Sequence, residues 1–370
     1  MCKSIELLLN IRTTKVSTMT TRKIMTALST FSFILFFPTL VLAQGRIVES
    51  DSHRFEEVAE GVWLASGTGS VYTMSNAMVL VGEFDTLVVD SQVTPTAARA
   101  LLDSISVITD KPVRYLVNSH YHFDHAHGTQ AFPDGVEIIG HEFTRKKLSG
   151  ESGNVLEERT FKSFSEPVPE TVANLERQAA AETDPVRKAE LVENHRTQRD
   201  YMSAIGEVQP TPPNITLDTK MSLFQVVADG SREIQLHHFG RAHTGGDVVV
   251  YLPQDKVVFT GDMMLPGLAY MGDAYVEEWP DALDGLLTLD FDTWLPGHGT
   301  VMRSKEVIGH FQEYLRDLWA QSTQMHSNGV NMEQAAQQID MTKHSQNYAQ
   351  IRGVGADIRA VRRIYELLDQ

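Results

Sequence analysis

The chain has 370 residues, of which 42% are hydrophobic, and its 32 Lys and Arg side chains against 48 Asp and Glu give a formal net charge of −16. This is the composition of a globular protein and excludes disorder throughout. The acidic balance, with no basic run longer than Arg145-Lys146-Lys147, argues against a nucleic-acid partner and leaves a small molecule as the expected one.

The strongest apolar run lies near the start of the chain. Arg22 and Lys23 precede the run 31–37, and the sequence Val41-x-Ala43 follows it. This order predicts a signal peptide over residues 1–43, since the run is shorter than the roughly 20 residues of a membrane-spanning helix. We therefore expect a periplasmic or secreted chain without a membrane contact after cleavage. The true start is one of Met1, Met19 and Met25.

Cysteine chemistry is excluded from the mature chain. The single cysteine, Cys2, lies inside the expected signal peptide. No thiolate then remains as a nucleophile or a metal ligand. Any metal must be held by His, Asp and Glu side chains.

Short β-type runs broken by turn residues predict strands in two parts of the chain. Thr94-Pro95 predicts a helix that continues to Ile108 and completes a β-α-β unit with the strands around it. Two β-rich halves with helical connections favour a layered α/β sandwich. The predicted strands cover residues 62–64, 77–81, 86–89, 113–117, 223–227, 234–239, 247–252 and 257–259.

Two further regions have helical patterns. Apolar residues recur at helical spacing over 168–179, and Asp184-Pro185 predicts a second helix toward Ile205. We interpret 151–213 as a helical insertion within a domain of residues 44–300. A lid over the active site and a helical pair packed elsewhere or used for dimerisation both remain open. Apolar stripes over 307–318 and 358–368 predict a C-terminal helical extension, 301–370, packed on the same domain.

The sharpest signal is the segment that follows the strand 113–117. His120, His122, Asp124 and His125 are four potential metal ligands within six residues. Alternate residues of an extended segment point to the same side, so His120 and His122 can reach one metal while Asp124 and His125 turn toward a second. Such a cluster is costly to bury unless a cation offsets its desolvation and repulsion.

Three later residues complete the set, each where a strand gives way to a loop. They are His243, Asp262 and His298. A single histidine or Gly-Asp turn usually has no functional role, but together with the earlier cluster these three residues predict a metal site. The edge of an α/β sheet is also where such sites are assembled.

The order of these residues resembles the metallo-β-lactamase superfamily. Asp90 ends a strand, HxHxDH covers 120–125, and His243, Asp262 and His298 follow in the order typical of that family. The resemblance covers about residues 55–300 and implies an αββα four-layer sandwich with a two-metal site. It places His120, His122 and His243 on one metal, Asp124, His125 and His298 on the other, Asp262 between them, and Asp90 behind the ligands.

Within that family, the ligand set of this chain, with a bridging carboxylate and no Cys ligand, is most similar to those of the glyoxalase II and lactonase-like groups. The resemblance implies two divalent metal ions, zinc first, with iron or manganese as alternatives. It also implies a metallo-hydrolase that cleaves an ester, lactone, thioester or amide of a small molecule with a metal-bridging hydroxide, which Asp124 can orient. Alternatives are a β-lactamase, a mononuclear iron sulfur dioxygenase-like enzyme and a non-enzymatic metal-binding protein. The substrate and the oligomeric state are not determined.

Apolar and aromatic residues surround the expected ligands in sequence. Pocket lining and core packing are equally good interpretations of them. His127 is not counted as a ligand. Arg241 is the one cation close to a ligand in the sequence, and a single positive charge argues against a multiply anionic substrate. The candidate substrate-pocket residues are Tyr72, Tyr121, Phe123, Met264 and Tyr270.

Overall fold

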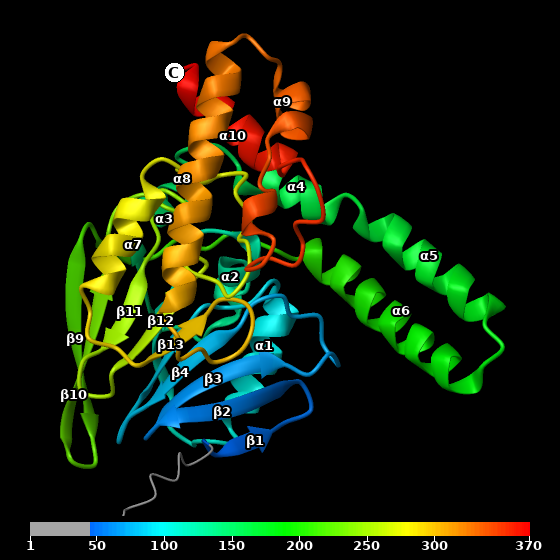
Figure 1. Cartoon of the computed structure of the whole chain (residues 1–370). Helices are drawn as coiled ribbons and strands as arrows, with labels where there is room; N and C mark the ends of the chain where they lie inside the picture. The colour runs from blue at the N-terminus through cyan, green and yellow to red at the C-terminus, as the bar shows by residue number, and fades with distance from the viewer. Residues whose placement is uncertain (1–44) are drawn as a thin grey trace, which may run out of the picture. The chain divides into compact units, whose positions relative to one another are not determined.

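A computed structural model describes residues 45–370 of the chain (Figure 1). The expected signal peptide, residues 1–43, lies outside the described residues. Within residues 45–370, no helix is both long and apolar enough to cross a bilayer.

The first sheet has eight strands in the order of the chain. Strands β1 to β5 pair antiparallel, and β5 to β8 pair parallel. Helix α1 (Pro95–Ile105) makes the crossover from β5 to β6 that a parallel pair requires. The strands are β1 (Ile47–Glu49), β2 (His53–Ala59), β3 (Val62–Gly67), β4 (Ala77–Val81), β5 (Thr86–Val89), β6 (Val113–Val117), β7 (Glu137–His141) and β8 (Ile215–Leu217).

The second sheet has five strands in the order β13-β12-β11-β10-β9. Only the β12–β13 pair is parallel, and helix α7 (Trp279–Leu287) lies between these two strands in the chain. The strands are β9 (Lys220–Val227), β10 (Gly230–His237), β11 (Val249–Leu252), β12 (Val257–Gly261) and β13 (Thr293–Pro296).

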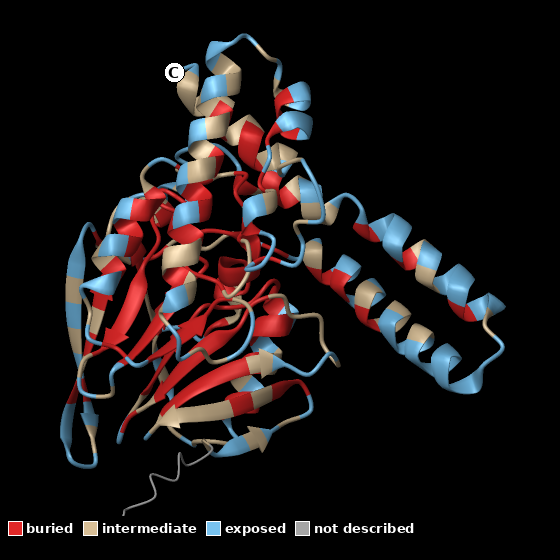
Figure 2. Cartoon of the chain, in the orientation of Figure 1, coloured by how far each residue is buried: buried red, intermediate tan, exposed pale blue. Residues whose placement is uncertain are grey.

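The two sheets face each other across a shared apolar core. In β3, Val62 and Leu64 point into this core, while Trp63 and Ala65 pack on the other face with α1. The outer face of the second sheet packs against α7, α8 (Glu306–Ser327) and α10 (Ile358–Leu368). Burial is accordingly concentrated in the strands (Figure 2). The chain therefore forms the four-layer αββα sandwich that the sequence resemblance implies.

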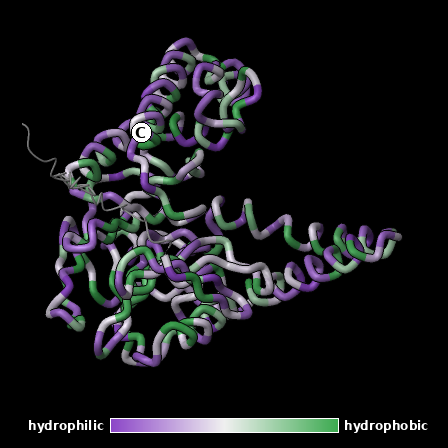
Figure 3. The backbone as a smooth tube through the Cα atoms, turned by 60° about the horizontal axis from the view of Figure 1, so that its bottom comes forward, coloured by the Kyte–Doolittle hydropathy of each residue, from purple (hydrophilic) through white to green (hydrophobic). Residues whose placement is uncertain are grey.

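Helices α5 (Val168–Ala181) and α6 (Pro185–Ile205) form an antiparallel pair (Figure 1), as the sequence predicts. The Asp184 side chain caps α6 by accepting hydrogen bonds from the backbone N–H groups of Val186 and Arg187. The hydropathy of the pair is mixed along its length (Figure 3). Its buried residues include Val172 and Tyr201, which lie away from the turn that joins the helices.

The two predicted C-terminal helices are present as α8 and α10, and α9 (Met332–Gln338) packs with both. The expected helix from Pro95 ends at Ile105 rather than Ile108, because the next residues form i to i+3 turns. The remaining helices are α2 (Phe123–Ala126), α3 (Glu142–Leu148) and α4 (Arg159–Ser165), with 3-10 turns at Thr129–Ala131, Val155–Glu157 and Thr342–His344.

Candidate metal centre

The structure brings all seven predicted ligands into one cluster at the ends of the strands, in which all but the half-buried His298 are buried. The motif begins just after β6, and α2 starts within it with His122 as its N-cap. This short helical turn changes the direction of the chain, so that the first two histidines face one way and the last two ligands another. The later ligands follow β10, β12 and β13.

The first group comprises His120, His122 and His243, whose candidate ligand atoms all lie within 4.8 Å of one another. The His243 Nε2 and His122 Nδ1 atoms are 2.9 Å apart. His120 Nε2 is buried and has no hydrogen-bond partner among the described residues. Since a buried nitrogen without a partner is unfavourable, this arrangement fits a bound cation.

The second group comprises Asp124, His125 and His298. The Asp124 Oδ2 atom lies 3.4 Å from His125 Nε2 and 3.1 Å from His298 Nε2.

Asp262 lies between the two groups. Its Oδ1 atom is 3.3 Å from His125 Nε2, and its Oδ2 atom is 3.2 Å from His298 Nε2 and 3.7 Å from His243 Nε2. Asp262 therefore contacts residues of both groups, and a bridging role between two metals stays a prediction.

The two groups differ in charge. Burial, followed by the neighbouring histidines, lowers the pKa of His243 to about 3 and that of His120 well below its usual range. Burial also lowers the pKa of His298, but the carboxylates of Asp262 and Asp124 outweigh it and raise that pKa to about 10. His120 and His243 of the first group are therefore neutral at pH 7, with lone pairs free for a cation. The second group holds protons that a cation would replace.

Asp90 lies behind the ligands, as expected. Its fully buried carboxylate accepts hydrogen bonds from the Ser119 N–H at 2.7 Å and the Ser119 hydroxyl at 2.8 Å. It also lies 2.7 Å from His125 Nδ1, which leaves Nε2 of that ring facing the cluster. The backbone of Asp90 has a φ of +69°, a conformation that costs a non-glycine residue about 1 to 3 kcal/mol.

Gly297 provides space for the cluster. A Cβ atom at this position would lie 2.2 Å from Asp262 Oδ1 and 2.8 Å from the His125 ring. The glycine of Pro296-Gly297-His298 is thus required by the close approach of two predicted ligands.

Two supporting aspartates were not identified from the sequence. Asp273 Oδ2 lies 3.0 Å from His122 Nε2 and also accepts a hydrogen bond from the Thr160 hydroxyl of α4. Asp247 accepts hydrogen bonds from the backbone N–H and the hydroxyl of Thr244, which orders the loop that carries His243. Neither aspartate stands in a motif, and only the folded chain shows what each one contacts.

The predicted pocket residues have different surroundings. Tyr270 contacts His122 edge to face, with ring centroids 5.9 Å apart, and Phe123 packs against Phe164 of α4 at 5.2 Å. Tyr121 lies beside His122, with ring centroids 4.8 Å apart.

The other two pocket residues contrast with each other. Tyr72 stacks on Tyr201 of α6 at 4.1 Å. The Met264 side chain is instead buried in the cluster formed with α7 and α8. Substrate contact by any of the five pocket residues stays a prediction.

Two other polar residues near the motif lie outside the predicted ligand set. His127 is buried against Phe123 and Phe161, and both of its ring nitrogens lack a partner among the described residues. Arg241 is paired with Glu278 on the surface, so its charge is already balanced.

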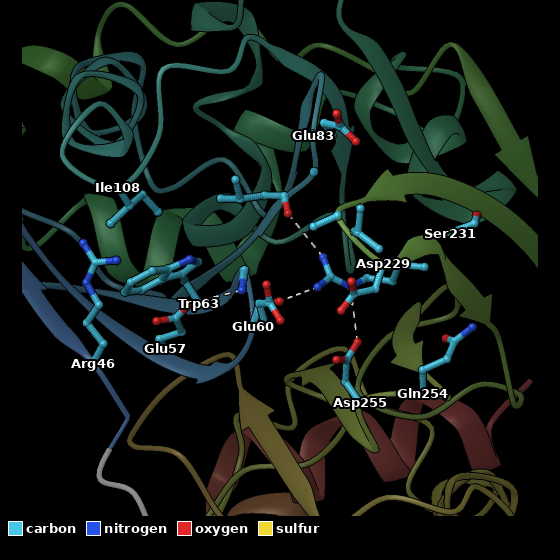
Figure 4. A pocket seen from close by; sticks show the side chains of 16 residues that line it. Arg46, Glu57, Glu60, Trp63, Glu83, Ile108, Asp229, Ser231, Gln254 and Asp255 are labelled. Atoms are coloured by element: carbon cyan, nitrogen blue, oxygen red, sulfur yellow. Dashed lines mark hydrogen bonds and ion pairs between the residues drawn. The ribbon is translucent and has the colours of Figure 1, made fainter.

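A separate cavity lies at the opposite end of the strands (Figure 4). Its lining includes Trp63 and Val81, whereas the other end of β4 adjoins the metal cluster through the hydrogen bond from Asn76 N–H to Gly297 O. The buried Arg232 in its wall is held by Asp255 and by the carbonyls of Glu60 and Val81. This arginine joins the ends of the two sheets.

Comparison with known proteins gives several similarities. The chain is 34% identical over 61 residues to the metallo-beta-lactamase type 2 of Elizabethkingia meningoseptica, a match over 15% of this chain and 24% of that protein. It is 20% identical over 296 residues to the linear primary-alkylsulfatase of Pseudomonas sp. (strain ATCC 19151), a match over 76% of this chain and 53% of that protein. The chain thus spans about a quarter and about half of the length of these two relatives.

Among solved structures, that of the DIM-1 metallo-beta-lactamase aligns with a TM-score of 0.48 and 18% identity, covering 73% of this chain and 99% of that one. The sequence profile described as "Metallo-beta-lactamase superfamily" matches residues 72–298. This match covers more than half of the chain and includes every predicted ligand. The chain belongs to the metallo-beta-lactamase superfamily.

Proposed function

We propose that this protein is a metal-dependent hydrolase with two divalent cations, zinc first, which cleaves an ester, lactone, thioester or amide bond of a small molecule. One observation carries the proposal: two groups of three candidate ligands lie side by side, with the Asp262 carboxylate between them. The donor set of five histidines and two aspartates suits zinc and also accommodates iron or manganese. The bridging carboxylate supports a grouping with glyoxalase II and lactonase-like enzymes.

The first group would hold one cation through His120, His122 and His243, and the second group the other through Asp124, His125 and His298. When bound, two such ions lower the pKa of water and polarise the scissile carbonyl. Residues behind the ligands orient the ligand side chains. Asp90 and Asp273 fix the rings of His125 and His122, and the Asp124 carboxylate can accept a proton from an attacking water.

The names of the relatives widen the range of bonds to test. One is called a β-lactamase and the other an alkylsulfatase. A lactam and a sulfate ester therefore belong beside the carboxylic esters in any screen. A mononuclear iron centre would make the dioxygenase-like alternative the better one.

The test is a substrate panel on zinc-loaded protein, with 4-nitrophenyl esters, γ-lactones, thioesters, a β-lactam and an alkyl sulfate. We expect turnover of at least one class. The His122→Ala variant should lose at least about 100-fold in kcat/KM, because the first group then lacks a ligand. Its matched control, His310→Ala, changes a histidine of α8 that lies outside the cluster. Absence of turnover across the panel, or equal rates in both variants, would contradict the proposal.

A further inference from the structure

A second cavity, of about 600 Å³, lies next to the metal cluster and is built mainly from the C-terminal extension. Its volume is in the usual range of small-molecule sites, roughly 300 to 1,000 Å³. The segment 350–357, between the last 3-10 turn and α10, forms one wall. Residues 268–271, which follow Asp262 in the chain, and Phe164 of α4 form the other.

Only one aromatic ring separates this cavity from a predicted ligand. Tyr270 lines the cavity, and its ring is also 5.9 Å from that of His122. The Tyr270 hydroxyl is held 2.9 Å from the Thr160 hydroxyl, so the ring has a fixed position. A molecule in the cavity would therefore lie within one side chain of the metal cluster.

The charges that line the cavity are not balanced. Its described lining includes three charged side chains, Arg352, Asp357 and Arg359. Asp357 and Arg359 form a two-pronged ion pair, with contacts of 2.7 and 3.0 Å. Arg352 is exposed and has no ion pair among the described residues. One positive charge therefore remains in a wall that otherwise includes Tyr314, Met341 and Ile351.

The nearby Arg159 does not change this balance, because both of its terminal nitrogens contact the Glu366 carboxylate, at 2.7 and 3.1 Å. The phenols of Tyr270 and Tyr314 add no charge to this lining, because a tyrosine is neutral at pH 7. The ligand that complements this lining has an apolar body and a single negative charge. The sequence alone did not place Arg352 near the predicted ligands, because it lies 54 residues beyond His298.

We propose that this cavity binds the distal, singly anionic and apolar end of the substrate, with Arg352 as the residue that selects the charge. The proposal rests on the proposed hydrolase function for its link to turnover. The bond to be cleaved would lie at the metal cluster, beyond the edge of Tyr270, and the anionic end would lie against the segment 350–357. Arg352 is a specificity residue and takes no part in bond cleavage.

Two fluorescent probes with the same ring system test the charge selection. The compound 8-anilinonaphthalene-1-sulfonate is an apolar monoanion, and N-phenyl-1-naphthylamine lacks the sulfonate. We expect Arg352→Gln to weaken binding of the sulfonate about two- to fivefold and to leave the neutral probe unchanged, as for an ion pair with an exposed arginine. Arg316→Gln is the matched control, because it removes the same charge from α8, outside the cavity.

Competition tests the link to turnover. The sulfonate probe should raise KM for an ester that the enzyme hydrolyses without lowering kcat. Equal sulfonate binding by wild type and Arg352→Gln, or probe binding that leaves KM unchanged, would overturn the proposal. If the probe binds as expected but no panel substrate is hydrolysed, the proposed function fails instead, so the two failures are distinguishable.

Discussion

At the residue scale, the orientation of the His122 ring depends on its contact with Asp273. Burial raises the pKa of this carboxyl, but the contacts with His122, Thr160 and Lys147 together outweigh burial and hold the pKa below its usual range. An ionised carboxylate on one ring nitrogen leaves the other nitrogen free to bind a cation.

Replacing Asp273 with Ala should therefore weaken metal binding about 10- to 100-fold, the usual effect of removing such a partner. Competition between the protein and a chelating dye measures the affinity. Asp273→Asn keeps an acceptor and should lose less. Asp229→Ala, in the exposed turn between β9 and β10, controls for the loss of a negative charge. Equal affinities in the Ala variant and wild type would mean that Asp273 only packs beside His122.

The second residue-scale prediction concerns pH. In the metal-free protein the pKa of His298 is about 10 and that of His125 is well above its usual range, so a cation at the second group must displace protons at pH 7. Its affinity should rise at least about tenfold per pH unit between pH 6 and 9. The first group should show little change, because its His243, with a pKa of about 3, is already neutral.

Zinc titrations at pH 6, 7, 8 and 9 separate the two steps. His298→Ala removes a ligand of the second group. It should abolish the pH-dependent binding step and keep the step at the first group, whose affinity changes little with pH. Two steps with the same dependence on pH would contradict the charge difference between the groups.

The seven predicted ligands could be found from the sequence because each stands in a short motif or at a strand end. Asp273 and Asp247 could not, since an isolated aspartate in a loop carries no spacing signal. Arg352 is a similar case. Arg241 is the one cation close to a ligand in the sequence, but the fold pairs Arg241 with Glu278 and brings the distant Arg352 to the cavity beside Tyr270.

At the element scale, α6 supports the loop between β3 and β4. Arg196 donates a hydrogen bond to the Ser70 carbonyl at 2.8 Å, and Tyr201 stacks on Tyr72. The same loop supplies the Met74 carbonyl that lies 2.8 Å from His298 Nδ1. The end of the helix pair that bears Tyr201 thus adjoins the metal cluster, while exposed Val186 and Val192 lie near its turn.

Two variants separate these ends of the helix pair. Replacing residues 177–189 with a short Gly/Ser linker should leave relative ester rates within about twofold, because the removed part does not contact the loop. Tyr201→Leu keeps an apolar side chain but removes the stack, and should change the preference between small and bulky esters severalfold. Steady-state kinetics on an ester series measure both. Unchanged preferences in Tyr201→Leu would remove any role of α6 in substrate selection.

The helices of this pair could be predicted because Asp184-Pro185 is a strong helix start and apolar residues recur at helical spacing. Their contacts could not, since neither pattern identifies what each helix packs against. The helix α9 was not predicted. It is short, and only Ala335 and Ala336 of its residues are buried, so it has no apolar stripe to recognise.

At the scale of the whole molecule, the strand pattern was sufficient to predict a layered α/β sandwich, whereas the four-layer arrangement was predicted from the family resemblance of the ligand motifs. The compartment stays a prediction. We expect the mature chain to begin at Gln44, because Val41-x-Ala43 closes the apolar run. Mass spectrometry of protein isolated from a Gram-negative host decides this. An intact N-terminus in the membrane fraction would indicate an anchor instead.

The proposed chemistry depends on two divalent cations, one held by each ligand group. The most direct measurement is elemental analysis of metal-replete protein beside native mass spectrometry, for wild type and His298→Ala. We expect two metal ions per chain in wild type and one in the variant, whose first group is intact. A single ion per chain in wild type, unchanged in the variant, would contradict this expectation.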